Sequence, residues 1–265
     1  MTPRNALALL LLSVTAFSTA AATEPTLTAT QIIAQANLAA FYPGKDGRSQ
    51  ARMKIVDANG NRQLRQFSIL RRNVSRGGDQ QLLVLFSRPA DVRGTVFRVE
   101  KHIDGNDDRW LYLPSLDLLR RISAGDKRSS FVGSDFFYED VSGRSPSADN
   151  FTLDKSDPDS YWLTAVPKDP NDVEFGHYQV QIDKATMLPL QTDYFDDHGQ
   201  HYRRIRAVKI GTINGHPTVL RSKVEDLRRG GYTLLEFRGV EYDLGLEPAL
   251  FSERTMRHVP KAYQR

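Results

Sequence analysis

The stretch RMKIVDANGNRQLRQFSILRR, residues 52–72, decides the fold. Apolar residues such as Met53 alternate with charged ones before Asn59-Gly60, and apolar residues such as Phe67 alternate with polar ones after it. An Asn-Gly pair between two alternating runs is the strongest local signal for a β-hairpin, because both residues tolerate the positive φ angles of a tight turn. The stretch therefore predicts two antiparallel strands.

The same pattern continues on both sides of one long interruption. Leu82 to Phe86 is apolar at every position, which is typical of a strand covered on both faces. His198-Gly199 and Asn214-Gly215 mark further tight turns. Besides residues 52–56, 62–72 and 82–86, the expected strands are residues 95–103, 109–113, 161–166, 178–182, 190–195, 202–210, 218–224 and 233–242. Roughly ten to twelve strands joined by sequential hairpins must curl or close on themselves, so we predict a mainly β protein with a single strongly curved antiparallel sheet.

One helix is predicted before the first strand. Apolar and small residues recur at helical spacing from Ile32 to Phe41, and Thr28 or Thr30 can cap the start. Pro43-Gly44 ends the pattern. The small, alanine-rich apolar face suits close packing onto a sheet.

The interruption is SAGDKRSSFVGSDFFYEDVSGRSPS, residues 123–147, which we call the central segment. It is too long for a hairpin turn and too apolar to be left disordered in water. We expect a short helix from about Ser134 to Val141, capped by Ser134, lying across the open face of the sheet. Glu139-Asp140 is interpreted as a solvated helix end.

The N-terminus predicts export. Arg4 provides a basic residue, an apolar run extends from Ala6 to Phe17, and Ala20 and Ala22 occupy the small-residue positions of a cleavage site. We expect a signal peptide at residues 1–22 and one domain at residues 23–265, with a retained membrane anchor as the alternative. The chain has no cysteine, which excludes a lipobox anchor and disulfides. The prediction is a soluble periplasmic protein.

The charged residues say little about which partner the protein binds. The net charge is +4, from 36 basic and 32 acidic residues, and arginines occur in pairs. The pairs are Arg71-Arg72, Arg120-Arg121, Arg203-Arg204 and Arg228-Arg229. A solvated surface is the favoured interpretation, and contact with anionic lipid headgroups or an acidic partner is the alternative. Nucleic acid is not expected as a partner in the periplasm.

Signatures of catalysis and metal binding are weak. The sequence lacks G-x-S-x-G, H-E-x-x-H, G-x-x-x-x-G-K-[ST] and G-x-G-x-x-G, so we expect no enzyme and no cofactor. Asp104-x-Asn106-x-Asp108 begins like a calcium loop but lacks the later Gly and Glu. His198 and His201 are three apart in a hairpin, where their side chains need not converge, and no metal site is predicted.

Aromatic residues suggest a ligand site. A curved sheet has a concave face that needs cover, and the central segment together with the first helix could cover it as a movable lid. The predicted ligand-binding residues are Phe86, Phe97, Trp110 and Tyr112 on the sheet and Phe131, Phe136, Phe137 and Tyr138 on the lid. Such a site would hold an acyl chain, because each buried methylene contributes about 0.8 kcal/mol.

The chain resembles the LolA/LolB-like superfamily, in particular its outer membrane lipoprotein-sorting branch. The resemblance rests on the layout from Thr28 to Val259, on SDFFYEDVSGR at residues 134–144, and on WLYLP at residues 110–114 followed by LRRI at residues 119–122. It implies an unclosed β-barrel with a few lid helices over an apolar cavity. Members carry lipoproteins or lipids between membranes, and this branch is linked to RND/MMPL-type inner-membrane exporters.

The resulting hypothesis is a monomeric periplasmic carrier or chaperone that binds a lipid or a lipoprotein acyl chain for transfer between the inner and outer membrane. The alternative is an accessory subunit that docks on an RND/MMPL-type exporter through arginine pairs and carries nothing itself. A lipid hydrolase is a third hypothesis, which the missing catalytic motifs disfavour.

Overall fold

The computed structural model describes residues 27–263. The signal peptide predicted at residues 1–22 lies outside this range. Between residues 27 and 263, no helix is both long and apolar enough to cross a membrane.

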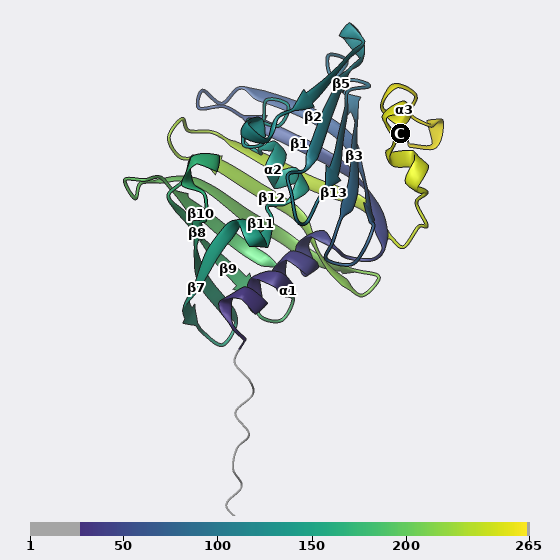
Figure 1. Cartoon of the computed structure of the whole chain (residues 1–265). Coiled ribbons are helices and arrows are strands. Elements are labelled where there is room, and N and C mark those ends of the chain that lie inside the picture. The colour runs from purple at the N-terminus through teal and green to yellow at the C-terminus, as the bar shows by residue number, and fades with distance from the viewer. Residues whose placement is uncertain (1–26, 264–265) are drawn as a thin grey trace, which may run out of the picture.

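Residues 27–263 form one antiparallel sheet of thirteen strands that is not closed into a barrel (Figure 1). Going from one edge to the other, the order is β6-β5-β4-β3-β2-β1-β13-β12-β11-β10-β9-β8-β7. The strands are β1 (Asp46–Val56), β2 (Arg62–Asn73), β3 (Gln80–Arg88), β4 (Val96–Lys101), β5 (Asp108–Leu113), β6 (Leu118–Ile122), β7 (Asp149–Ser156), β8 (Ser160–Pro167), β9 (His177–Asp183), β10 (Pro189–Phe195), β11 (His201–Ile213), β12 (His216–Asp226) and β13 (Tyr232–Tyr242). The predicted single curved antiparallel sheet is confirmed.

The hairpin that decides the fold forms as predicted. β1 and β2 pair antiparallel, with Ala51 opposite Phe67. Gly60 has a φ of 83°, and the Asp57 carboxylate accepts the backbone N–H groups of Asn59 and Asn61, both at 2.9 Å. The turn therefore fixes a register in which alternate residues of both strands reach the same face.

The strands β6 and β7 are not among the eleven strands predicted from the sequence. These are the two edges of the sheet, so each pairs with only one neighbour. Each contains a single buried residue, Ile122 in β6 and Asp149 in β7. Because edge strands bury so little, they lack the apolar alternation by which the inner strands were found.

The prediction that β3 is covered on both faces is confirmed. Leu82, Val84 and Phe86 belong to the core on the concave side, whereas Leu83 and Leu85 pack on the convex side. The convex cover is the C-terminal part of the chain, which includes α3 (Glu253–Arg257) and lies outside β3 (Figure 1). Leu246, Leu250, Phe251 and Met256 are its buried residues in this cluster.

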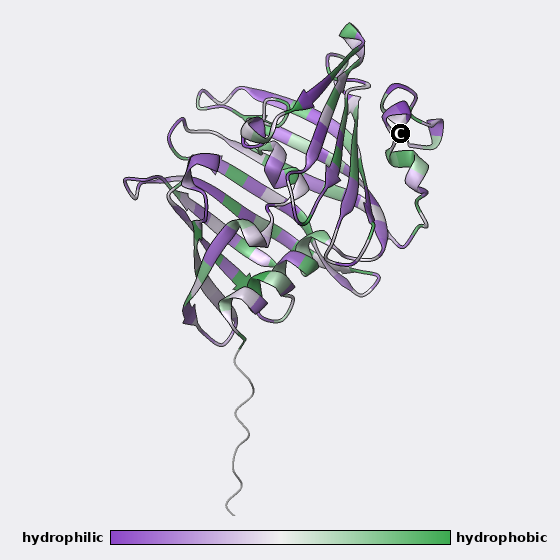
Figure 2. Ribbon diagram, viewed as in Figure 1, coloured by the Kyte–Doolittle hydropathy of each residue, from purple (hydrophilic) through white to green (hydrophobic). Residues whose placement is uncertain are grey.

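Helix α1 (Ala29–Phe41) confirms the predicted first helix, and Thr28 is its cap. The Thr28 hydroxyl accepts the backbone N–H of Gln31 at 3.3 Å, while the Gln31 side chain accepts the N–H of Thr28 at 2.9 Å. The helix crosses the concave side of the sheet and carries mostly apolar and weakly polar residues (Figures 1 and 2). Its buried residues, Ile32 and Ala36, pack against β8 and β9.

The central segment joins β6 to β7 and therefore connects the two edges of the sheet across its concave side. The helix expected at Ser134–Val141 is wrong in its bounds. The observed helix, α2, spans Tyr138–Ser142. Residues 131–136 form a tight loop instead, in which the Phe131 N–H donates to the Phe136 carbonyl at 2.7 Å and Val132 has a φ of 48°. Ser134 donates to the Phe131 carbonyl at 2.7 Å, so its hydroxyl stabilises this loop rather than a helix start.

Candidate ligand-binding cavity

A cavity of about 410 Å³ lies between α1, the central segment and the concave face of the sheet. This volume falls in the range of about 300–1,000 Å³ that is usual for small-molecule sites. Its surface is mainly apolar. The apolar side chains around it include Ile33, Ala40 and Phe41 from α1, Phe131, Phe136 and Val141 from the central segment, and Met53, Ile69, Val180, Ile205, Val219, Leu235 and Phe237 from the sheet.

The structure brings only part of the predicted ligand-binding set to this cavity. Phe131 and Phe136 border it. Phe86, Phe97 and Tyr138 instead pack beside it in the core. The Phe131 ring lies 5.7 Å from that of Phe86, and 5.5 Å from those of Phe97 and Tyr138, between ring centres. These three residues therefore support the cavity from behind.

Trp110 and Tyr112 lie on the opposite face of the sheet from the cavity. On β5, the alternate residues Arg109 and Leu111 point inward, and Arg109 donates to the Ser142 hydroxyl of α2 at 3.1 Å. Trp110 and Tyr112 consequently pack on the convex side with the C-terminal part of the chain. Their expected place on the sheet side of the cavity is wrong by one register step, which exchanges the two faces of a strand.

Most of the cavity wall was absent from the predicted set. The missed residues belong to α1, such as Ala40, and to inward-facing positions of the central strands, such as Met53 and Phe237. The sequence feature that could have indicated the strand positions is the alternation of apolar and polar residues, as in β1 and β2. This alternation identifies the strands, but the predicted lining consisted of aromatic residues only.

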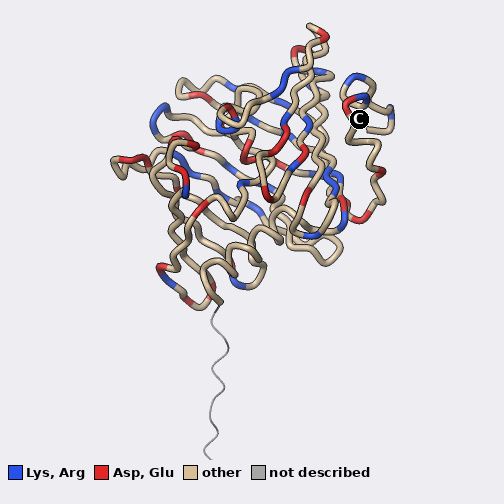
Figure 3. The backbone as a smooth tube through the Cα atoms, viewed as in Figure 1, with Lys and Arg blue, Asp and Glu red and all other residues tan. Residues whose placement is uncertain are grey.

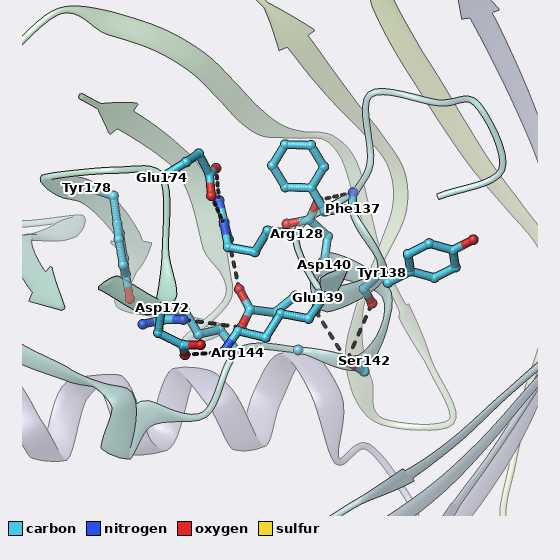
Figure 4. Close-up of polar contacts among 12 residues, drawn as sticks. Arg128, Phe137, Tyr138, Glu139, Asp140, Ser142, Arg144, Asp172, Glu174 and Tyr178 are labelled. Carbon is cyan, nitrogen blue, oxygen red and sulfur yellow. Dashed lines mark hydrogen bonds and ion pairs between the residues drawn. The ribbon is translucent and has the colours of Figure 1, made fainter. Parts of the chain in front are cut away.

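Glu139 stands at the centre of a buried group of ion pairs (Figure 4). Its carboxylate oxygens accept from Arg128 at 2.8 Å and from Arg144 at 3.2 Å. Arg128 also holds Glu174, and Arg144 also holds Asp149, through pairs of hydrogen bonds. The interpretation of Glu139-Asp140 as a solvated helix end is therefore wrong, because both carboxylates are buried and paired.

These contacts determine the charge states. Burial alone would raise the pKa of Glu139, but Arg128 and Arg144 outweigh burial and hold it below its usual range. The pKa of Glu174 is lowered in the same way, chiefly by the hydrogen bond from Arg128. A buried ion pair with good hydrogen bonds is costly to break, because the remaining charge has no partner. The central segment is thus anchored by charge.

Phe137 belongs to this anchor rather than to the cavity. The Arg203 guanidinium lies 4.1 Å from the centre of the Phe137 ring and pairs with Asp140. Arg203 also donates to the Asp135 carbonyl at 3.0 Å. Arg203 is only 3% exposed, so at this position the prediction of a solvated arginine pair is wrong. Figure 3 shows the acidic and basic residues that gather on the central segment and the strands around it.

Candidate metal ligands lie away from the cavity. Glu100, His102 and Asp108 converge, with ligand atoms within 4.8 Å of one another. Both carboxylates already pair with arginines, Glu100 with Arg98 and Asp108 with Arg121. We assign this cluster to surface ion pairing. The earlier candidate His201 pairs with Asp193 at 2.9 Å.

The fold and the cavity define the class of protein, a LolA-like half-barrel. A LolA superfamily protein from Nitrosomonas europaea shares the fold with a TM-score of 0.67 and 18% identity, covering 86% of this chain and 99% of that one. An outer membrane lipoprotein-sorting protein domain from Vibrio parahaemolyticus gives a TM-score of 0.79 and 25% identity, covering 86% and 98%. A DUF1329 family protein from Desulfovibrio piger gives 0.77 and 28%, covering 85% and 97%.

The comparison with family models assigns the chain to a family. A family model described as an uncharacterized protein matches residues 78–258, and the chain belongs to that family. A search of curated proteins finds no match. The resemblance to the LolA/LolB-like superfamily and its lipoprotein-sorting branch is confirmed by the solved structures.

Proposed function

We propose that the protein is a periplasmic carrier that binds the acyl chain of a lipid or lipoprotein and transfers it between the inner and outer membrane. The observation that carries this proposal is the apolar cavity of about 410 Å³ between α1 and the sheet. Apolar walls hold an alkyl chain without specific chemistry, since each buried methylene contributes about 0.8 kcal/mol. No bond is made or broken in this function.

The cavity can be tested by filling it. Ala40 borders the cavity, whereas Ala34, on the same helix, is exposed to solvent. Ala40→Phe is expected to displace an acyl chain and weaken binding of a fluorescent fatty acid by about tenfold or more, the equivalent of about two methylenes of contact. Ala34→Phe is the matched control and should bind as the wild type does. Equal binding by both variants and the wild type would reject the cavity as the site.

A second candidate function is docking on an RND/MMPL-type inner-membrane exporter. The end of the β5–β6 hairpin favours it, because Leu116 and Leu118 are 68% and 45% exposed and lie near the exposed Arg120 and Arg121. Exposed apolar residues rimmed by charge are common at protein interaction sites. Leu116→Asp should abolish recovery of a membrane partner in a pull-down, while Leu64→Asp, at an exposed leucine on β2, should not. Loss of recovery with both would indicate a nonspecific contact.

A further inference from the structure

Arg71 is a cation at the wall of an apolar cavity without an acidic partner. Its side chain extends from β2 on the concave face, where it borders the cavity. The hydrogen bond that it makes is a long one, from Nη1 to the Phe41 carbonyl at 3.3 Å. Burial lowers the pKa of the guanidinium, and the groups that favour its charge are the hydroxyls of Tyr242 and Tyr42 rather than a carboxylate. An arginine remains protonated even so.

The other arginines at the cavity differ from Arg71 in this respect. Among residues 27–263, four arginines border it, and three of them pair with acids. The pairs are Arg48 with Glu241, Arg144 with Asp149 and Arg206 with Glu225. Asp46 also borders the cavity, but its carboxylate oxygens accept the backbone N–H groups of Leu244 and Leu246, each at 2.7 Å. Within this set, Arg71 is the one with charge left to bind a ligand.

The backbone around Arg71 brings a second polar side chain next to it. Gly47 on β1 lies between Arg71 on β2 and Tyr242 on β13 in the sheet register. A Cβ at Gly47 would lie 2.8 Å from Cδ1 of Tyr242, so only glycine lets this ring cross the strand. The Tyr242 hydroxyl lies 2.9 Å from the Thr218 hydroxyl, and Arg71, Thr218 and Tyr242 all border the cavity. Arg71, Tyr242 and Thr218 thus form one polar end of an otherwise apolar space.

A purely structural role for Arg71 would be to cap the C-terminal end of α1. The carbonyl that it contacts, that of Phe41, already accepts a shorter hydrogen bond from the Gln80 side chain at 2.7 Å. Four of the five N–H donors of a guanidinium can therefore serve another acceptor. A partly buried cation without a counter-ion is unfavourable, and an anion that relieves this cost can reach Arg71 through the cavity.

We propose that Arg71 is the headgroup-binding residue of the cavity and that the ligand is an amphiphile whose alkyl chain ends in an anionic group, a carboxylate or a phosphate. This inference rests on the proposed function, because the cavity must hold an alkyl chain for its head to reach Arg71. The planar guanidinium fork binds carboxylates and phosphates in a bidentate manner. The alkyl chain would extend from Arg71 along the apolar walls toward Met53 and Phe237.

The test compares ligands that share one alkyl chain and differ at the head: hexadecanoate, hexadecyl phosphate and hexadecanol. The wild type is expected to bind the two anions about tenfold or more tightly than the alcohol, as expected for one charge-assisted hydrogen-bonded pair. If the wild type binds one anion more tightly than the other, this preference shows whether the anionic group of the ligand is a carboxylate or a phosphate. Arg71→Gln should remove the preference for anions over the alcohol by weakening binding of the two anions far more than binding of hexadecanol, and Arg71→Lys should restore part of the preference.

The matched control is Arg72→Gln, which changes the neighbouring arginine on the opposite face of β2, where it donates to Gln81 at 3.1 Å. This variant should keep the wild-type preference. Equal affinity of the wild type for anions and alcohol would overturn the role of Arg71 but leave the carrier function standing. Failure of the wild type to bind any of the three ligands would overturn both.

Discussion

The two elements that cover the concave face are held in different ways. Helix α1 packs through small apolar residues, with Ile32 and Ala36 buried against β8 and β9. The central segment packs through aromatic rings and is in addition fixed to the rest of the chain by ion pairs, Arg128 with Glu174 and Asp140 with the buried Arg203. From the sequence, both elements were expected to form one movable lid. The structure separates them, because only the central segment carries charges that are costly to release.

This difference indicates which wall of the cavity moves. Opening the central segment would break the ion pairs that join it to the rest of the chain, Arg128 with Glu174 and Asp140 with Arg203. Helix α1 carries no charged residue, so moving it breaks no ion pair and exposes mainly apolar residues such as Ile32 and Ala36. We therefore expect a ligand to enter beside α1, with the central segment as a fixed floor. Elements with few buried contacts open at the lowest free-energy cost.

The largest expected effect comes from removing the charge that anchors the central segment. Arg128 has a side chain 6% exposed between Glu139 and Glu174. Arg128→Gln should lower the free energy of unfolding by about 3–5 kcal/mol and the melting temperature by about 10 °C, measured by thermal denaturation. Arg121→Gln, which breaks an exposed pair with Asp108, should cost less than about 1 kcal/mol. Similar losses from both variants would contradict a charge-anchored floor.

The aromatic rings of the central segment should separate stability from binding. Phe131 is 1% exposed and contacts several rings, so Phe131→Ala should cost about 3–5 kcal/mol in denaturant unfolding. Phe136 borders the cavity as Phe131 does but is slightly more exposed, at 7%, so Phe136→Ala should cost less stability while it still weakens binding of a fluorescent fatty acid. A larger stability loss at Phe136 than at Phe131 would show that the floor is oriented differently.

Acid should loosen the central segment. The folded-state pKa values of Glu139 and Glu174 lie below their usual range, so the stability they provide is complete above about pH 4.3 and is lost as the pH falls further. Melting temperatures should fall steeply below this pH in the wild type and less steeply in Arg128→Gln. Parallel pH profiles for the two proteins would show that these carboxylates do not depend on Arg128.

The smallest expected effect concerns α1 alone. Thr28→Ala removes the cap and should destabilise the helix by about 1 kcal/mol, which hydrogen exchange would detect as faster exchange of α1 amides. Amides of α2 should exchange as before. Thr30→Ala is the control, since the cap is Thr28. Faster exchange in α1 and α2 together would mean that the two covers open as one lid.

The hairpins, the first helix and the doubly covered β3 could be predicted because local patterns specify them. Asn59-Gly60 fixes a turn, and the run Leu82–Phe86 has no solvent-facing position. The edge strands β6 and β7 were missed because a strand with one neighbour needs little apolar surface. The predicted elements are specified by residues close to one another in the sequence. The missed strands lack a second neighbouring strand and so lack the pattern that would reveal them.

The site was harder to predict than the fold, because it depends on which face of a strand each side chain takes and on partners from other parts of the chain. Trp110 was placed on the wrong face because nothing within β5 distinguishes the two faces. Glu139 was expected to be solvated because the sequence does not specify the path of the loop that brings its partner Arg128 to it. Arg71 could not be distinguished from Arg72 until the sheet register placed only the first of them at the cavity.

The central claim is that the cavity between α1 and the sheet holds one acyl chain. Native mass spectrometry of the protein purified without detergent, followed by organic extraction, tests it most directly. We expect close to one lipid per chain for the wild type and for Ala34→Phe, and an empty protein for Ala40→Phe. A wild-type protein that is empty and takes up no added fatty acid, or equal lipid content in both variants, would contradict it.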